Sequence, residues 1–146
     1  MVGFSDSRVV DVQLITFPKN HQVKGNITAV NSGLEIPFSI KRVYYLYDIP
    51  GGESRGGHAH KALRQLIVAG SGSFDLVLND GIQTRTIRLS QPYEGVLIPP
   101  GIWRELTSFS SGAICLVLAS EVFQEEDYLR NYEDFQSRKH SNTPDR

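Results

Sequence analysis

Short segments rich in Val, Ile, Leu, Tyr and Phe recur through the middle of this chain, and turn-forming residues separate them at fairly regular intervals. The strongest turn is NDG at 79–81, which joins the apolar segment 73–79 to the alternating segment 82–89 and favours a β-hairpin. SG at 71–72 and PPG at 99–101 break the pattern in the same way. Many short strands with evenly spaced turns are typical of an all-β sandwich or barrel.

The remaining apolar segments predict further strands. One should begin near His58, after the loop 49–57, in which a proline and four glycines oppose regular structure. The segment 113–120 is apolar and β-branched enough to be a central strand. The other predicted strands cover 38–48, 63–70, 95–99 and 102–109.

The C-terminal part changes character. A chain of 146 residues fits one domain, and we predict a single domain over residues 1–136. We expect residues 137–146 to fray. Within EEDYLRNYEDFQ, apolar residues at spacings of three and four predict a short helix packed on the barrel: Tyr128, Leu129, Tyr132 and Phe135.

Composition narrows the function classes. The net charge is −1, from 15 basic and 16 acidic residues, and no basic block interleaves with aromatic residues, which argues against nucleic-acid binding. The first residues lack the pattern of a secretory signal and no segment approaches the roughly 18 apolar residues of a membrane span, so we expect a cytoplasmic protein. The single cysteine, Cys115, lies in an apolar run and is expected to be a buried, inert thiol.

Two histidines stand one residue apart after the glycine-rich loop. In a strand, His58 and His60 project to the same side and Ala59 projects to the other. They could hold a metal, transfer protons, or be satisfied core residues. A strand that runs from a glycine-rich loop into a barrel is where a pocket with a few converging polar groups would form.

The spacing around these histidines resembles the first motif of the cupin superfamily, in which a glycine, a His-x-His pair, an acidic ligand and a second glycine follow in order. Here the acidic position is Gln65, and Arg104 stands where a second motif would place a third histidine. A guanidinium repels a divalent metal, and two imidazoles with a carboxamide make a poor site for a hard metal. The resemblance therefore implies a cupin jelly-roll barrel without a metal. Neutral histidines, with an ordinary pKa of about 6.5, then favour acid–base chemistry.

A longer stretch, from about Gly25 to Phe135, resembles the dTDP-4-oxo-6-deoxyglucose 3,4-oxoisomerase family of nucleotide-sugar ketoisomerases. The most specific parts are RGGHAHK at 55–61 and KRVYY at 41–45. The resemblance implies a cupin-fold isomerase that moves a ketone from carbon 4 to carbon 3 of a dTDP-linked 4-oxo-6-deoxyhexose without a cofactor. It also implies a homodimer that exchanges N-terminal strands, and a place in the synthesis of amino-deoxysugars for cell-surface glycans such as the O-antigen of lipopolysaccharide.

The resemblance assigns the catalytic roles to His58, His60 and Tyr44. Ketone migration needs a base at carbon 3 and an acid at carbon 4, each contributing roughly 10²–10⁴-fold. We expect His58 to be the base, with His60 and Tyr44 serving the proton return or the enediolate oxygen. Arg42 shares the strand face of Tyr44. A cross-strand packing role for Tyr44 is the alternative.

The diphosphate of such a substrate requires cationic or N–H donors, and arginine offers a forked geometry. We choose Arg42, Arg55 and Arg104 from the available arginines, together with Gln65 at the altered ligand position. Trp103 could stack on thymine, but adjacent strand residues face opposite sides, so Trp103 and Arg104 cannot both point inward.

One departure from the family concerns the N-terminal region. Family members often carry an arginine in an Asp-x-Arg-Gly element, and Lys24 stands at that position, which keeps the charge but loses the forked guanidinium.

The runner-up function is a dTDP-sugar 3,5-epimerase, and the third is a non-catalytic sugar-nucleotide-binding cupin. The sequence leaves both the gluco and the galacto configuration open for carbon 4 of the product.

Overall fold

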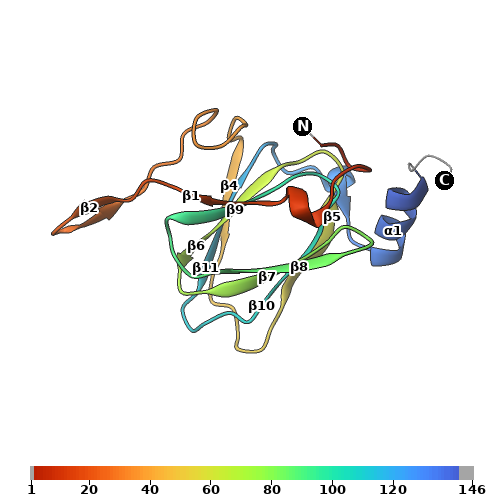
Figure 1. Ribbon diagram of the computed structural model, residues 1–146. Helices are drawn as coiled ribbons and strands as arrows, with labels where there is room; N and C mark the ends of the chain where they lie inside the picture. Colours follow the sequence, from red (N-terminus) through yellow and green to blue (C-terminus); the bar gives the residue numbers. More distant parts are fainter. Residues whose placement is uncertain (1, 142–146) are drawn as a thin grey trace.

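The computed structural model describes residues 2–141, which form two facing antiparallel sheets (Figure 1). One sheet has the strand order β1-β9-β6-β11-β4 and the other has β12-β5-β10-β7-β8. The main core lies between them, because it joins Ile67, Val96 and Val117 of the first sheet to Leu76 and Leu106 of the second. This arrangement confirms the predicted all-β, cupin-type jelly roll.

The strands are short, and those from β4 to β11 lie within a few residues of the predicted ones. Their bounds are β1 Gln13–Thr16, β2 Asn20–Gln22, β3 Gly25–Ile27, β4 Arg42–Leu46, β5 Arg55–His60, β6 Gln65–Ser71, β7 Phe74–Asn79, β8 Thr84–Leu89, β9 Glu94–Ile98, β10 Trp103–Thr107, β11 Ile114–Ala119 and β12 Tyr128–Leu129. Strand β11 lies between β6 and β4, as its apolar sequence predicted.

The predicted hairpin turn at 79–81 joins β7 to β8. The Asp80 carboxylate holds this turn by accepting hydrogen bonds from the backbone N–H groups of Ile82 and Gln83, and it accepts a third from Val9. Asparagine and aspartate favour such turns because their side chains satisfy nearby backbone donors. The third bond also fastens the N-terminal segment to the barrel.

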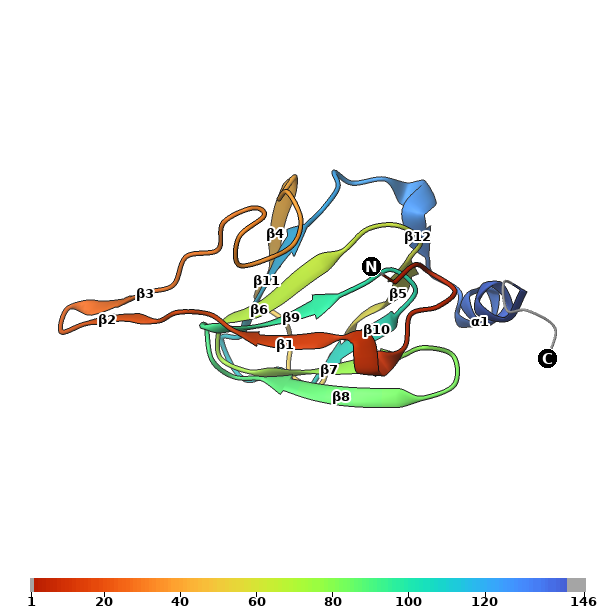
Figure 2. The same cartoon turned by 45° about the horizontal axis from the view of Figure 1, so that its top comes forward.

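The N-terminal region forms two parts with different surroundings. A 3₁₀ turn at Val9–Asp11 leads into β1, which pairs with β9 of the same chain. The β2–β3 hairpin then projects away from the barrel (Figure 2). Every residue of β2 and β3 is exposed, so this hairpin, which we call the arm, is not part of the barrel core.

The C-terminal region differs from the expected helix. Tyr128–Leu129 forms the strand β12, which pairs with the edge of β5, after a 3₁₀ turn at Glu125–Asp127. The helix α1 follows at Tyr132–Ser141. Residues 137–141 are therefore helical, whereas we expected fraying from 137, and 142–146 lie outside the described residues.

Packing explains why α1 continues beyond the expected end. Phe135 is fully buried against Trp103 at the base of the helix. One turn later, Lys139 donates hydrogen bonds to the backbone carbonyls of Phe4 and Ser7.

No helix within residues 2–141 is long and apolar enough to cross a membrane.

Candidate active site

A cavity of about 200 Å³ opens between the two sheets. Its walls carry polar side chains from both, since Tyr44 lies on β4 and Gln65 on β6, while His58 lies on β5 and Arg104 on β10. The full lining is Arg42, Tyr44, Leu46, Arg55, Gly56, His58, Gln65, Ile67, Arg104, Leu106, Cys115, Val117, Tyr128 and Arg130. Residues 42, 44 and 46 share a strand face, as expected, and line the cavity together.

Glycines at the start of β5 bring His58 to this cavity. Gly56 and Gly57 have φ values of +92° and +72°, a region that glycine adopts without steric cost. A Cβ at Gly56 would stand 3.0 Å from the backbone oxygen of Arg104, so the missing side chain lets β5 lie close to β10. The register then pairs His58 with Arg104.

The two altered cupin ligands contact each other. Arg104 is almost fully buried and donates a hydrogen bond to Oε1 of Gln65, at 2.5 Å, and a second to the carbonyl of Ile102. The Gln65 amide donates in turn to the Tyr44 hydroxyl oxygen, at 3.0 Å. These side chains form a hydrogen-bonded chain across the barrel interior, while Nε of Arg104 is buried without a partner.

This hydrogen bond leaves the hydroxyl hydrogen of Tyr44 available to a ligand, because its oxygen already accepts from Gln65. Burial, and next the proximity of Tyr128, raise the pKa of Tyr44 above its usual value. A phenol has an ordinary pKa of about 10, so Tyr44 is protonated at neutral pH. It is a hydrogen-bond donor or an acid in this cavity.

His58 has the opposite character. Burial, and next the positive charge of Arg104, lower the pKa of His58 to about 3, so its imidazole is neutral at physiological pH. Its Nε2 atom is buried and has no hydrogen-bond partner. A neutral imidazole nitrogen without a partner can accept a proton from a bound molecule.

His60 shares the strand face of His58, with ring centroids 4.9 Å apart, but it does not line the cavity. It is fully buried behind His58 and Tyr128, whose ring centroid lies 4.4 Å from its own. Burial and the charge of Arg104 hold the pKa of His60 far below its usual value, although the Asp127 carboxylate lies 3.1 Å from its Nδ1 atom. The expectation that both histidines reach the same open space therefore holds for His58 alone.

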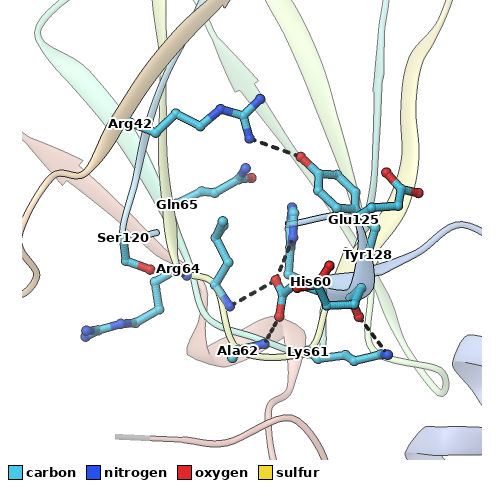
Figure 3. Close-up of polar contacts among 12 residues, drawn as sticks. Arg42, His60, Lys61, Ala62, Arg64, Gln65, Ser120, Glu125 and Tyr128 are labelled. Carbon is cyan, nitrogen blue, oxygen red and sulfur yellow. Dashed lines mark hydrogen bonds and ion pairs between the residues drawn. The ribbon is translucent and has the colours of Figure 1, made fainter. Parts of the chain in front are cut away.

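The cavity mouth lies where the edge strands of the two sheets approach. Arg42 of β4 donates a 3.4 Å hydrogen bond to the Tyr128 hydroxyl of β12, above Gln65 and His60 (Figure 3). Its guanidinium also lies over the Tyr44 ring, 4.3 Å from the centroid. Among the described residues, four arginines and no carboxylate line the cavity, although the whole chain is slightly acidic. This local charge suits an anion.

Two predicted substrate contacts lie elsewhere. Trp103 is buried outside the cavity, against the rings of Tyr132 and Phe135 at 5.2 and 5.7 Å, because strand alternation turns Arg104 inward. Trp103 therefore does not line the cavity in which the expected stacking on thymine would take place. Lys24 lies in the turn of the arm and does not line the cavity of its own chain; the arm itself projects away from the barrel (Figure 2).

Tyr128 and Arg130 line the cavity, but sequence reasoning missed both. The spacing of the apolar residues was interpreted as helical, whereas Tyr128 pairs with His60 in a strand ladder. The signal that could have found them is the spacing of two, which places Tyr128 and Arg130 on one side of an extended chain. Arg130 makes a bidentate ion pair with Glu125, in which its Nε and Nη2 atoms each donate a 2.9 Å hydrogen bond to a carboxylate oxygen.

The residues present do not fit a cupin metal. The positions of the acidic ligand and of the third histidine hold Gln65 and Arg104, which bind each other, and a buried guanidinium opposes a cation. No group of three or more His, Cys, Asp or Glu within residues 2–141 is arranged to hold a metal ion. Cys115 is buried in the cavity wall, where burial raises the pKa of its thiol to about 12, so it is not a nucleophile.

The fold and the site thus define a small cupin-type barrel whose interior cavity is lined by a histidine, tyrosines and arginines. Comparison with known proteins gives the family. The family model described as FdtA: WxcM-like, C-terminal matches residues 10–140, and the chain belongs to this family. A curated relative, the TDP-4-oxo-6-deoxy-alpha-D-glucose-3,4-oxoisomerase of Aneurinibacillus thermoaerophilus, is 42% identical over 123 residues, which are 84% of this chain and 88% of the relative.

Solved structures agree with this membership. A 3,4-ketoisomerase from Helicobacter canadensis has 40% identity and a TM-score of 0.87, covering 89% of this chain and 98% of its own. The sugar 3,4-ketoisomerase QdtA from Thermoanaerobacterium thermosaccharolyticum, in complex with TDP, has 36% identity and a TM-score of 0.89, covering 92% and 98%. The resemblance to 3,4-oxoisomerases is confirmed. A dTDP-4-dehydrorhamnose 3,5-epimerase from Bacillus anthracis shares only 20% identity, with a TM-score of 0.72 over 84% of this chain and 79% of its own, and shows the fold alone.

Proposed function

We propose that this chain is a dTDP-4-oxo-6-deoxyglucose 3,4-ketoisomerase that works by metal-free acid–base chemistry. The observation that carries the proposal is the pairing of two groups in one cavity: His58, whose imidazole is kept neutral by burial and whose Nε2 has no partner, and Tyr44 with a free hydroxyl hydrogen. The chain's relatives are 3,4-ketoisomerases, and a relative bound to TDP shows that the family fold accepts this nucleotide.

In the proposed reaction, Nε2 of His58 takes the proton from carbon 3, and the electrons of that bond form the enediolate with the carbon-4 carbonyl. Tyr44 donates a proton to carbon 4, and the proton of the carbon-3 hydroxyl passes to the carbon-4 oxygen, so that carbon 3 becomes the ketone and carbon 4 carries the hydroxyl. His58 and Tyr44 end the cycle by exchanging protons with solvent or with each other. No electron acceptor is needed, because the ketone only changes place.

The arginines would bind the dTDP part of the substrate, which carries the negative charge. Arg42, Arg55 and Arg130 are the solvent-accessible arginines of the cavity lining and would hold the diphosphate by charge-assisted hydrogen bonds. Arg104, on the cavity floor with Gln65, would stabilise negative charge on the enediolate oxygen. A bound dianion also offsets the positive charge that lowers the pKa of His58, which makes the imidazole a stronger base when substrate is present.

The test is incubation with dTDP-4-oxo-6-deoxyglucose, followed by NMR of the product. Migration of the ketone to carbon 3 is expected, and the same spectrum distinguishes the gluco from the galacto configuration at carbon 4. Inversion with the ketone kept at carbon 4 would indicate an epimerase, and binding without turnover a non-catalytic cupin. Both outcomes would overturn the proposal. Activity should survive exhaustive chelation, and loss of a stoichiometric metal together with activity would contradict the metal-free mechanism.

We also propose that the chain acts as a cytoplasmic homodimer in the synthesis of amino-deoxysugars for cell-surface glycans such as the O-antigen. Support for the dimer comes from the arm. A two-stranded hairpin is at best marginally stable alone in water, and this one is exposed along both strands. Because β1 pairs with β9 of its own chain, the arm is the part available for exchange, and it would carry Lys24 to a partner.

A further inference from the structure

Asp127 contacts His60 and the end of β5 at the same time. Its Oδ2 atom lies 3.1 Å from Nδ1 of His60, and its Oδ1 accepts a hydrogen bond from the backbone N–H of Ala62 at 2.8 Å; Figure 3 draws both contacts as dashed lines that end on the labelled His60 and Ala62. A longer contact, 3.3 Å, joins Oδ2 to the N–H of Leu63. Two backbone N–H groups thus fix the position of the carboxylate that contacts the imidazole.

This arrangement decides which nitrogen of His60 carries the proton. A carboxylate only accepts hydrogen bonds, so the neutral imidazole must place its hydrogen on Nδ1 to make this contact. Nε2 then has a lone pair and no hydrogen, and it is buried without a partner. The second contacts made by a functional histidine commonly fix its tautomer in this way.

The alternative tautomer would disturb the proposed base. An Nε2–H on fully buried His60 would need an acceptor inside the barrel. The groups that face His60 are the rings of His58 and Tyr128, together with the positive charges of Arg42, Arg104 and Arg130. Arginine cannot accept a hydrogen bond, which leaves the unpartnered Nε2 of His58 and the hydroxyl of Tyr128 as the possible acceptors among these groups.

The geometry points to Asp127 as a positioning residue of the ketoisomerase reaction: it holds His60 as the Nδ1–H tautomer and so keeps a competing donor away from the lone pair of His58. His60 is then an acceptor in the resting site, and Tyr44 is the proton donor. This inference rests on the proposed function for its kinetic consequence, but its tautomer assignment stands on the contacts of Asp127 alone.

The test compares Asp127→Asn with the wild type and with Asp75→Asn, a matched change at a surface carboxylate that pairs with Arg88. In Asp127→Asn, the single oxygen of the new amide is expected to keep the shorter bond to Ala62, which turns its NH₂ group toward His60. The imidazole must then accept at Nδ1 and carry its hydrogen on Nε2. Nitrogen-15 NMR of the ring nitrogens distinguishes the two tautomers without substrate.

We expect the tautomer of His60 to switch in Asp127→Asn and kcat to fall by about 10- to 100-fold, while KM and the Kd for dTDP change by less than about twofold. Asp127→Glu, which keeps a carboxylate, should retain the Nδ1–H tautomer and recover part of the rate. In a His60→Gln background, Asp127→Asn should cost little further rate, because the two changes act through one imidazole.

An unchanged tautomer in Asp127→Asn would overturn the inference, and so would a switched tautomer with a wild-type rate. A lower melting temperature with unchanged kcat below the transition would show that Asp127 serves only to hold Ala62 and Leu63. If the wild type does not move the ketone at all, the proposed function fails, and the NMR measurement still decides the tautomer assignment.

Discussion

At the scale of single residues, burial gives the two reactive groups opposite tendencies. It raises the pKa of Tyr44 and lowers that of His58 to about 3, because low-dielectric surroundings disfavour the charged form of each. The phenol therefore keeps its proton and the imidazole lacks one. The cavity needs no carboxylate to obtain an acid and a base at neutral pH.

These roles predict different kinetic phenotypes. His58→Asn should abolish ketone transfer and also the exchange of the carbon-3 hydrogen with deuterated solvent, because the base is lost. Tyr44→Phe should slow ketone transfer by about 10²–10⁴-fold while leaving some exchange, since the first proton can still be removed. Binding of dTDP should change little in both variants. If His58→Asn exchanges the carbon-3 hydrogen at the wild-type rate, His58 is not the base.

The depressed pKa of His58 predicts an unusual pH dependence. A base with the ordinary pKa of histidine loses activity below about pH 6.5. Here the imidazole stays neutral in the free enzyme down to about pH 3, so kcat/KM should remain level from pH 8 to pH 5. A fall in kcat/KM with an apparent pKa near 6.5 would contradict this environment for His58.

The same shift has a consequence for stability. Between the unfolded pKa near 6.5 and the folded value of about 3, the unfolded chain binds the His58 proton more readily, so stability is lost as the pH falls through this window. The loss is at most about 1.4 kcal/mol per pH unit for this one group. Denaturant unfolding at pH 7 and pH 5 should show a smaller loss in His58→Asn than in the wild type, because asparagine does not titrate.

At the scale of elements, the turn between β9 and β10 is hydrogen-bonded to the end of β5, the strand that carries His58 and His60. The N–H of Gly101 donates a hydrogen bond to the carbonyl of His60, at 2.9 Å. Gly101 has a φ of +80°, and a Cβ at this position would collide with the backbone carbonyl of Phe4. The glycine therefore allows β5, the β9–β10 turn and the N-terminal segment to meet.

Gly101→Ala should consequently destabilise the protein strongly. Gly112 supplies a matched control, because its φ is +74° and a Cβ there would meet nothing within 4 Å. Gly112→Ala should cost about 1–2 kcal/mol of unfolding free energy, from the left-handed backbone alone, and Gly101→Ala at least about 3 kcal/mol, because steric overlap adds to strain. Equal losses in chemical denaturation would show that the close approach to Phe4 does not matter.

At the scale of the whole molecule, the arm predicts the oligomeric state. Sedimentation of the wild type should give twice the mass of the 16.3 kDa chain. Replacing residues 18–29 with a short Gly-Ser linker should give a folded monomer, since Phe17 and Val30 belong to one apolar cluster and leave the ends of the linker close. This deletion spares β1, whose removal would expose the edge of β9.

A wild-type monomer at micromolar concentration would contradict the strand-exchanged dimer, and so would a dimer that survives loss of the arm. Circular dichroism of the deletion variant serves as the control for folding. If the monomer forms and its activity falls while its spectrum is unchanged, the arm, including Lys24, contributes to catalysis as well as to assembly.

The sequence by itself determined the features that depend on local chemistry. The alternation of apolar residues and the NDG and PPG turns predicted most strands, since these signals act over a few neighbouring residues. The spacing of His58 and His60 placed both on one strand face, and Gln65 and Arg104 identified a cupin pocket with altered ligand positions. The family resemblance supplied Tyr44, and strand parity added Arg42 to the same face.

Only the tertiary structure decided which of these groups meet in space. The bond between Arg104 and Gln65 joins strands of opposite sheets, and the pairing of β12 with β5 turned a helical pattern into a strand that brings Tyr128 to the cavity. Burial of His60 beside that strand and Asp127 kept it out of the cavity that His58 lines. Such contacts depend on how distant segments pack, and the competition between helix and strand for a two-residue element is settled by its partner strand rather than by its own sequence.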